Sequence, residues 1–415
     1  MIESSHHQVI VSHPTGNQNC RSVLTVLEER RALAWFGTML GFGADSMWPK
    51  LLAGSLREKL LRRAYTLPSK KIRMGGMREI IRLTAAAIAW DDLIRHEIGW
   101  ASVDRVYKTL DRFVANQLPQ EKGVRVVYAY EDGALETFRE AKKEGIHCVY
   151  ELPIAYWTTV LRLLQEEEER LPEWRALLRG KRDSTAKLDR KTEELSLADL
   201  VICPSNFVAN SFSLPEKRVA VIPFGSPPPL TNAVKKMEKK IRVLFVGSLT
   251  QRKGLADLFQ AIRILKRKDI ELVVLGTLLA PMEFYRRQCS DFIYESPRSH
   301  HLTLKLMATC DIFVLPSLVE GRALVIQEAM SRALPIIITP NTGGGDLIED
   351  NDCGFLVPIR SPTSIAEKIS YLADAPELRR AMGERGRLKA LKLTWKLHGE
   401  RVWNEIKPLL HTSHI

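Results

Sequence analysis

Two glutamates, Glu320 and Glu328, stand eight residues apart on either side of an apolar run. Residues 311–317 predict a buried strand that ends in a turn, and residues 325–332 predict a helix. Where a strand feeds the start of a helix in an α/β sheet, free backbone N–H groups and the helix dipole favour an anion. A helix that starts just after Glu320 puts Glu328 about two turns along its axis, roughly 8–12 Å away.

Two further loops that follow apolar strands carry groups suited to phosphate. One strand opens into Gly247 and Ser248, and the adjacent cations Arg252 and Lys253 come next. Arginine offers a planar fork to phosphate oxygens and lysine a compact charge. Residues 334–346 predict another buried strand with a loop of three glycines, which let a backbone approach a ligand closely. Two isolated glutamates would more often be surface residues, but these neighbours favour a site for a nucleotide diphospho-sugar.

In this order the motifs resemble the C-terminal half of GT-B glycosyltransferases of the retaining family 4. The matching elements are the G-x-x-x-x-R-K-G loop of residues 247–254, the E-x7-E motif of residues 320–328 and the G-F-L-V-P strand of residues 354–358. The resemblance extends from about residue 196 to the C-terminus. It implies an α/β protein with two Rossmann-like domains that face each other across a cleft.

The resemblance also implies roles for individual residues. Glu320 faces the donor sugar, and Glu328 accepts hydrogen bonds from the ribose diol. Arg252 and Lys253 stabilise the charge on the departing diphosphate, so that no metal ion is required. Arg322 either grips phosphate or points to solvent. The full set of expected donor contacts is Gly16, Gly247, Ser248, Arg252, Lys253, Arg322, Ala323, Leu324, Val325 and Glu328.

The acceptor side is less clearly encoded. Many family members place a His after the fourth strand of the first domain, but residues 128–134 contain none. Glu131 is the candidate catalytic base or positioning group there, with Asp132 as its alternative. A loop carboxylate without a functional role explains the sequence equally well. His13 and Gly16 follow the first strand, at an edge where open sheets bind ligands, and a simple turn also explains His13.

Strands that alternate with helices predict parallel α/β sheets. Residues 1–222 are expected to form the acceptor-side domain, 223–240 a linker rich in Pro and Lys, and 241–393 the nucleotide-sugar domain. By the resemblance, a last helix within 394–415 crosses back onto the first domain. In the first half we expect strands at 7–11, 124–130, 148–152 and 200–204, and helices at 21–38, 55–64, 77–90, 100–116 and 155–178.

The composition and net charge limit where the protein is expected to act and with which partners. Six scattered cysteines without a C-x-x-C pair predict reduced thiols and a cytoplasmic protein, and no apolar run reaches the ~20 residues of a membrane span. The net charge of +12 favours acidic partners, although no motif indicates nucleic acid. Residues 50–82, which combine ten Lys/Arg with leucines, predict peripheral contact with the inner face of an anionic membrane; a solvated basic face is the competing interpretation.

The sequence therefore predicts a metal-independent glycosyltransferase without a resident cofactor. It would move a hexose-type unit from a UDP- or GDP-sugar to a glycan or lipid-linked acceptor, in polysaccharide or glycoconjugate assembly. Retention of configuration is implied by the resemblance alone. A non-catalytic nucleotide-sugar-binding protein, and an epimerase or phosphorylase of the same fold, remain alternatives.

Overall fold

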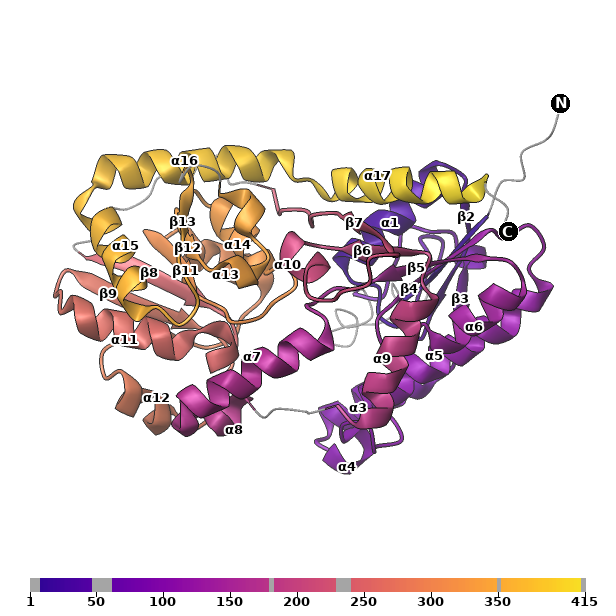
Figure 1. Ribbon diagram of the computed structural model, residues 1–415, viewed down its shortest axis with the longest axis horizontal. Coiled ribbons are helices and arrows are strands. Elements are labelled where there is room, and N and C mark those ends of the chain that lie inside the picture. Colours follow the sequence, from indigo (N-terminus) through magenta and orange to yellow (C-terminus); the bar gives the residue numbers. More distant parts are fainter. Residues whose placement is uncertain (1–7, 47–61, 179–182, 229–239, 349–351, 412–415) are drawn as a thin grey trace.

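Two parallel sheets, each flanked by helices, make up the computed structural model (Figure 1). It describes residues 8–46, 62–178, 183–228, 240–348 and 352–411. The seven-stranded sheet has the order β3-β2-β1-β4-β5-β6-β7, and the six-stranded sheet has the order β10-β9-β8-β11-β12-β13. Neighbouring strands within each sheet pair in parallel. The predicted α/β class with two Rossmann-like sheets is confirmed.

The first sheet and its helices use residues 9–221. Its strands are β1 (Val9–Ser12), β2 (Leu33–Thr38), β3 (Ile72–Met74), β4 (Val126–Tyr130), β5 (His147–Glu151), β6 (Leu200–Cys203) and β7 (Arg218–Val221). The helices of this half are α1 (Gln18–Glu29), α3 (Arg78–Ala87), α4 (Asp91–Ile94), α5 (Val103–Gln117), α6 (Leu135–Lys143), α7 (Trp157–Arg170), α8 (Arg175–Leu178), α9 (Thr185–Leu197) and α10 (Asn206–Ala209).

The second sheet begins after the proline-rich segment. Its strands are β8 (Ile241–Val246), β9 (Ile270–Leu275), β10 (Ile293–Glu295), β11 (Ile312–Leu315), β12 (Ile336–Ile338) and β13 (Gly354–Leu356). The helices that follow are α11 (Leu255–Leu265), α12 (Met282–Gln288), α13 (His300–Met307), α14 (Leu324–Met330), α15 (Pro362–Asp374), α16 (Pro376–Lys392) and α17 (Trp395–Ile406). Strands β11 and β12 are buried along their whole length, as expected of parallel strands covered on both faces.

In each sheet the strand order reverses at one place, between β1 and β4 in the first and between β8 and β11 in the second. The crevice outside the carboxyl ends of the strands at such a point is where open α/β sheets bind ligands. The loops that begin after β1, β4, β8 and β11 carry Gly16, Glu131, Gly247 and Glu320, respectively. All four are residues that the sequence singled out.

Two segments tie the halves together. Helices α7 and α8 leave the first sheet and lie against the second (Figure 1), where the fully buried Trp174 joins the core around Phe259 and Tyr285. At the C-terminus, α16 covers the second domain and α17 runs along α1 of the first. His398 in α17 lies 2.7 Å from the hydroxyl of Ser22 in α1.

The predicted helix over residues 21–38 is wrong in its second half. Helix α1 ends at Glu29, Arg31 adopts a left-handed conformation with φ 57°, and the chain then forms strand β2 between β1 and β3. The aromatic, apolar run of β2 is a strand signal that helical spacing obscured. Most of the predicted helix over residues 55–64 lies outside the described residues, and Ala64 forms a bridge to Phe42 instead. In the first half, strands β3 and β7 and helices α4, α6, α9 and α10 were also not predicted.

All six cysteines are buried and free. Among the described residues, no helix combines the length and the apolar character that crossing a membrane demands.

Candidate active site

The loop after β8 is fixed by close backbone contacts. Gly276 packs on Gly247, and a Cβ at Gly276 would lie 1.7 Å from the Gly247 carbonyl oxygen. The hydroxyl of Thr250 accepts the Arg252 N–H at the start of a short 3₁₀ turn, and Gly254 ends that turn with φ 73°. A Cβ at Gly254 would lie 2.0 Å from the Pro316 carbonyl oxygen. Glycine therefore allows the loop to reach the end of β11.

Both cations of this loop meet Glu320. Lys253 Nζ lies 2.6 Å and Arg252 Nη1 3.0 Å from Glu320 Oε1, and Glu320 is only 8% exposed. Burial lowers the pKa of Lys253, although Glu320 opposes the shift. Because two cations face one carboxylate, the cluster keeps an excess of positive charge that an anionic ligand can use.

The residues just after Glu320 lie at the interface between the two halves of the chain. A Cβ at Gly321 would lie 1.7 Å from the Pro153 carbonyl oxygen, and the Ser205 hydroxyl donates to the Gly321 carbonyl at 2.7 Å. Arg322 is buried beside them. Its Nε donates to Gln327 Oε1 at 2.8 Å, and its Nη1 donates to the Gly343 carbonyl at 3.1 Å and to Asp346 Oδ1 at 2.7 Å. The alternative that Arg322 points to solvent is therefore wrong. That Arg322 contacts phosphate stays a prediction.

Helix α14 places the second glutamate of the motif. Ala323 is its N-cap residue, Leu324 and Val325 form the exposed and half-exposed start, and Glu328 lies one turn further on. Glu328 Oε1 is 3.1 Å from His300 Nε2 of α13. Burial raises the pKa of Glu328, although His300 opposes the shift.

Gln327, inside the same motif, holds the segment between the domains. Its Nε2 donates to the Phe224 carbonyl at 2.8 Å and to Ser226 Oγ at 3.1 Å. The ends of the E-x7-E motif thus carry carboxylates paired with basic side chains. Between them, Gly321 and Arg322 contact the first half of the chain, and Gln327 contacts the segment between the domains.

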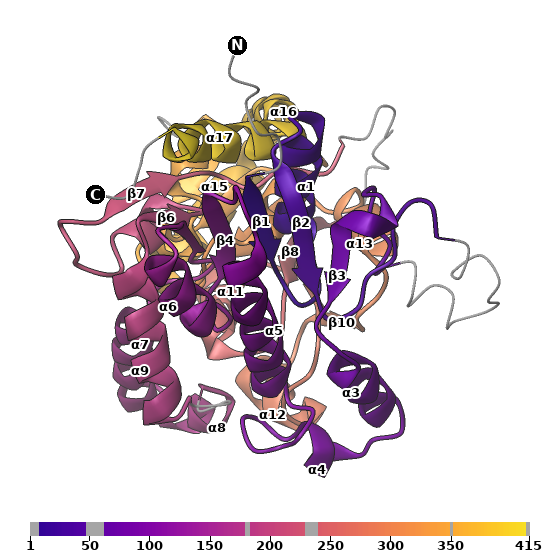
Figure 2. The same ribbon diagram turned by 90° about the vertical axis from the view of Figure 1, so that its right-hand side faces the viewer.

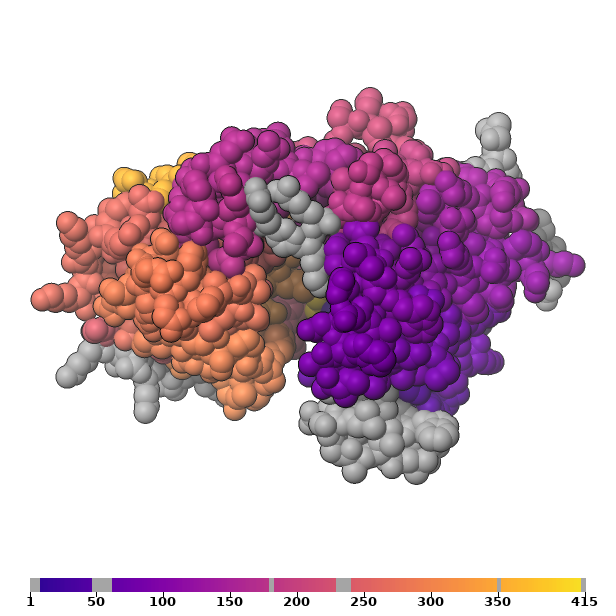
Figure 3. Space-filling view, turned by 90° about the horizontal axis from the view of Figure 1, so that it is seen from below, coloured from indigo at the N-terminus to yellow at the C-terminus, as the bar shows by residue number. Residues whose placement is uncertain are grey.

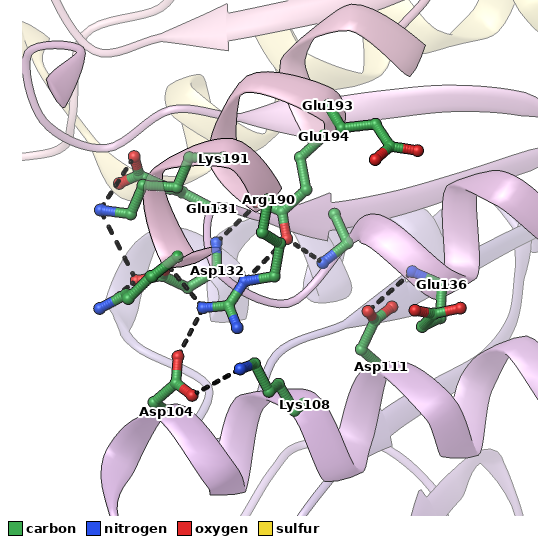
Figure 4. A network of polar contacts seen from close by, with 12 residues as sticks. Asp104, Lys108, Asp111, Glu131, Asp132, Glu136, Arg190, Lys191, Glu193 and Glu194 are labelled. Atoms are coloured by element: carbon green, nitrogen blue, oxygen red, sulfur yellow. Dashed lines mark hydrogen bonds and ion pairs between the residues drawn. The ribbon is translucent and has the colours of Figure 1, made fainter. Parts of the chain in front are cut away.

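On the acceptor side, Glu131 follows β4 and is 9% exposed. Burial raises its pKa to about 7, even though Lys191 of α9 lies 3.5 Å away and opposes the shift. Lys191 also pairs with Asp183 at 3.0 Å. Although burial favours its neutral form, the surrounding Glu131, Asp132 and Asp183 raise the pKa of Lys191 above its usual range. Figure 4 shows Glu131 and Lys191 at one edge of a wider polar network.

The loop that carries Glu131 is held in a strained conformation. Asp132 has φ 74°, in the left-handed region that L-residues rarely adopt. Glu194 of α9 accepts the N–H groups of Asp132 at 2.9 Å and Ala134 at 3.1 Å, while Arg190 pairs with the Asp132 carboxylate at 3.0 Å (Figure 4). Burial raises the pKa of Glu194 to about 8. Strain that the surroundings enforce is common at functional sites.

His13 stabilises a turn, as in the simpler of the two interpretations of its position in the sequence. Its Nδ1 accepts the N–H groups of Thr15 at 3.0 Å and Gly16 at 2.7 Å. Burial, and secondarily Arg63, lower the pKa of His13 to about 3, so its ring is neutral. Gly16 has φ 55°, and a Cβ there would lie 2.3 Å from the Tyr65 hydroxyl oxygen.

One cavity brings the two sides together. It has a volume of about 410 Å³ and is lined by Glu131 and Lys191 from the first half and by Ser248 and Arg252 from the second. Figure 3 shows the hollow between the two halves from below. Of the predicted site residues, only Glu131, Ser248 and Arg252 line this cavity. The predicted residues that do not line it are Gly16, Gly247, Lys253, Glu320, Arg322, Ala323, Leu324, Val325 and Glu328. The sequence missed Lys191 because α9 was not identified, although Ser184 and the helically spaced Lys187, Lys191 and Glu194 offered a signal.

One cluster has ligands suited to a metal ion. His96 Nε2 lies 3.2 Å from both Glu97 Oε1 and Asp183 Oδ1. The Asp183 carboxylate already faces Lys187 at 2.8 Å and Lys191, and Glu97 accepts two hydrogen bonds from Ser184. The cluster is therefore explained as an ion-pair network without a metal.

The known proteins that this chain resembles in sequence are glycosyltransferases. Residues 230–389 match the family described as glycosyl transferases group 1. The capsular polysaccharide biosynthesis glycosyltransferase CapM of Staphylococcus aureus is 25% identical over 248 residues, which are 51% of this chain and 63% of CapM. The alpha-D-kanosaminyltransferase of Streptomyces kanamyceticus is 29% identical over 39% of this chain and 44% of that protein. The chain thus spans less than two thirds of these relatives.

Solved structures match over nearly the whole chain. Sucrose-phosphate synthase from Thermosynechococcus elongatus superposes with a TM-score of 0.63 at 14% identity, over 97% of this chain and 99% of that one. HepE of Anabaena, in complex with UDP, gives a TM-score of 0.63 at 14% identity, over 97% and 100% of the chains. At this identity the likeness establishes the fold, two Rossmann-like domains in the GT-B arrangement.

Proposed function

We propose that this chain, which has the GT-B fold and belongs through residues 230–389 to the glycosyl transferases group 1 family, transfers a sugar from a nucleotide-sugar donor to a glycan acceptor. The observation that carries the proposal is a cavity at the two sheet reversal points, with Arg252 on one wall and Glu131 on the other. A donor on the second domain and an acceptor on the first would meet there.

On the donor side, the bond between the anomeric carbon and the diphosphate oxygen breaks, and the nucleoside diphosphate leaves with the electron pair. Arg252 and Lys253 stabilise the charge that develops on its phosphate oxygens. Glu320, which the two cations hold in place, faces the sugar and stabilises the positive charge on its ring. Glu328 accepts hydrogen bonds from the ribose diol. Backbone N–H groups of Leu324 and Val325 and the loop at Gly247 and Ser248 complete the donor contacts.

On the acceptor side, a hydroxyl oxygen forms the new bond to the anomeric carbon and loses its proton to Glu131. A carboxyl group with a pKa of about 7 suits this task, because a substantial fraction is ionised at neutral pH and that fraction is basic enough to take a proton. The likeness to HepE, which was solved with UDP, favours a UDP-sugar as donor. The similarity to CapM favours a role in polysaccharide assembly. We further propose that the acceptor oxygen attacks the oxocarbenium-like carbon from the face that the diphosphate leaves, so that configuration is retained, and that the cations replace a metal ion.

The test is a panel of UDP- and GDP-sugars, screened first for thermal stabilisation of the protein and then for turnover. We expect one donor to raise the melting temperature, because a ligand that binds the native state stabilises it by mass action. We also expect that donor to be hydrolysed slowly alone and faster with a glycan acceptor. Stabilisation without turnover would favour a binding protein. Turnover that requires inorganic phosphate would favour a phosphorylase.

A further inference from the structure

A segment of the first half of the chain lies against the donor loop, residues 247–254, of the second half. This segment, which we call the α7–α8 arm, comprises residues 157–178. Its buried Trp174 packs against the rings of Phe259 and Tyr285. Figure 1 and Figure 2 show the arm on the side of the molecule opposite α16 and α17. The arm is therefore a connection between the halves that is separate from α17.

Gln251 is the residue of the donor loop that meets the arm. Its Nε2 donates to Glu167 Oε1 of the arm at 2.6 Å and to Asp257 Oδ2 of α11 at 2.7 Å. Its Oε1 accepts the Ala256 N–H at 2.7 Å. Gln251 and Glu167 are both fully buried. An amide side chain can donate two hydrogen bonds and accept a third, which a carboxylate cannot do, so these partners require glutamine here.

The residues on either side of Gln251 face the cavity. Thr250 and Arg252 both line it, whereas Gln251 between them points to the arm. The Thr250 hydroxyl donates to the Leu177 carbonyl of the arm at 3.2 Å and accepts the Arg252 N–H at 3.4 Å. Because the arm holds both residues that precede Arg252, it also fixes where the backbone of Arg252 lies.

The two acids of this network are paired with arginines. Arg360 Nε donates to Glu167 Oε2 at 2.7 Å, and Arg170 Nη2 lies 2.9 Å from Asp257 Oδ1. Burial raises the pKa of Asp257, although Arg170 opposes the shift. Pairing only roughly offsets the free-energy cost of taking such charges out of water, so the network adds little net stability. What it supplies is a defined position for Gln251.

We propose that Glu167 and Gln251 are positioning residues for sugar transfer. Glu167 holds Gln251, and Gln251 aligns the adjacent Arg252 with the phosphate oxygens of the departing nucleoside diphosphate. Arg252 Nη1 donates to the Val319 carbonyl and to Glu320 Oε1, each at 3.0 Å, and the guanidinium offers donors on its other nitrogens as well. This role, which rests on the proposed function, does not require Glu167 or Gln251 to touch the substrate.

A double-mutant cycle on kcat tests the proposal, with the donor that the nucleotide-sugar panel identifies. Gln251→Ala should lower kcat by up to about 10²-fold, because small misplacements of a catalytic group have effects of this size. Arg252→Ala should lower kcat further. The double variant should match Arg252→Ala within about twofold, since Gln251 acts only through Arg252. Losses that multiply in the double variant would overturn the proposal.

Arg360→Asn is the matched control. It removes a different hydrogen bond to Glu167, from a residue outside the donor loop, and Asn tolerates the left-handed φ of 59° at this position. The control should lower the melting temperature but keep kcat within about twofold of the wild type. If kcat fell in both variants in proportion to the melting temperature, the network would only hold the halves together, and the proposal would be wrong.

Amide hydrogen exchange of the free protein distinguishes this proposal from the proposed function. Exchange of residues 248–253 should be at least about tenfold faster in Gln251→Ala, because the loop opens more often, and unchanged in Arg360→Asn. Unchanged exchange in Gln251→Ala would overturn the positioning role, whether or not a donor is turned over. Faster exchange in a protein that turns over no nucleotide sugar would refute the proposed function and retain the effect of Gln251 on the loop.

Discussion

The donor and acceptor walls of the cavity achieve their chemistry in different ways. On the donor wall, two cations, of which Arg252 lines the cavity, meet one buried carboxylate, and all three groups come from loops that directly follow neighbouring strands. On the acceptor wall, Glu131 lies in a dense network in which acids outnumber bases, and its basic partner comes from α9, about sixty residues away. The first arrangement leaves net positive charge for an anion, and the second tunes the pKa of one carboxyl.

Hydrogen bonds and ion pairs also connect the donor loop to helix α7 of the first half. Gln251, in the donor loop, donates to Glu167 Oε1 of α7 at 2.6 Å and to Asp257 Oδ2 at 2.7 Å. Arg360 of the second domain donates to the same glutamate at 2.7 Å, and Arg170 of α7 pairs with Asp257 at 2.9 Å. Because α7 comes from the first half of the chain, the position of the donor loop depends on both halves.

The largest expected effect is on the donor wall. Lys253→Ala should lower kcat roughly 10³-fold, because it removes a preorganised charge from the leaving phosphate. Steady-state kinetics and a thermal melt together check this result, and Lys396→Ala, an exposed lysine on α17, serves as the control. A loss of activity that is matched by a collapse of the melting temperature would mean that the Lys253–Glu320 pair is structural.

Glu131→Gln should test the acceptor wall with a smaller loss, about 10²-fold in kcat, as expected for removal of a general base. Since the base works only when ionised, the wild-type rate should rise with pH through about 7, and the variant should lose this rise. The pH profile of kcat checks both statements. An unchanged profile in Glu131→Gln, with a loss in Asp132→Asn, would transfer the role to Asp132.

Glu328→Ala should weaken binding of the free nucleoside diphosphate about tenfold, because hydrogen bonds to a charged group contribute roughly 1.5–3 kcal/mol. Calorimetry with UDP and GDP measures this effect, and Glu384→Ala, an exposed acid on α16, is the control. Unchanged affinity in the Glu328 variant would remove the ribose assignment but leave the cation cluster untouched.

The smallest expected effect is that of a chelator. If Arg252 and Lys253 supply the positive charge, transfer should continue at the same rate after dialysis against EDTA. Loss of activity that returns on addition of Mg²⁺ or Mn²⁺ would show that the donor wall needs a metal ion.

The sequence predicted the donor wall more completely than the acceptor wall. Gly247, Arg252, Lys253 and Glu320 lie in one contiguous domain, each shortly after an apolar strand, so their meeting followed from the parallel α/β pattern. Lys191 could not be found in this way, because its contact with Glu131 depends on how α9 packs against the loop after β4. The strand β2 was missed because local helical spacing continued past Arg31.

By itself, the sequence determined the alternation of strands and helices, the glycine loops and the order of the acidic and basic groups, since these depend on local backbone preferences and burial of apolar runs. Only the tertiary structure decided that Arg322 contacts the first half of the chain, that Gln327 contacts the segment between the domains, and that burial brings the pKa of Glu131 near 7. Such properties depend on what surrounds a side chain in space, and residues distant in sequence supply those surroundings.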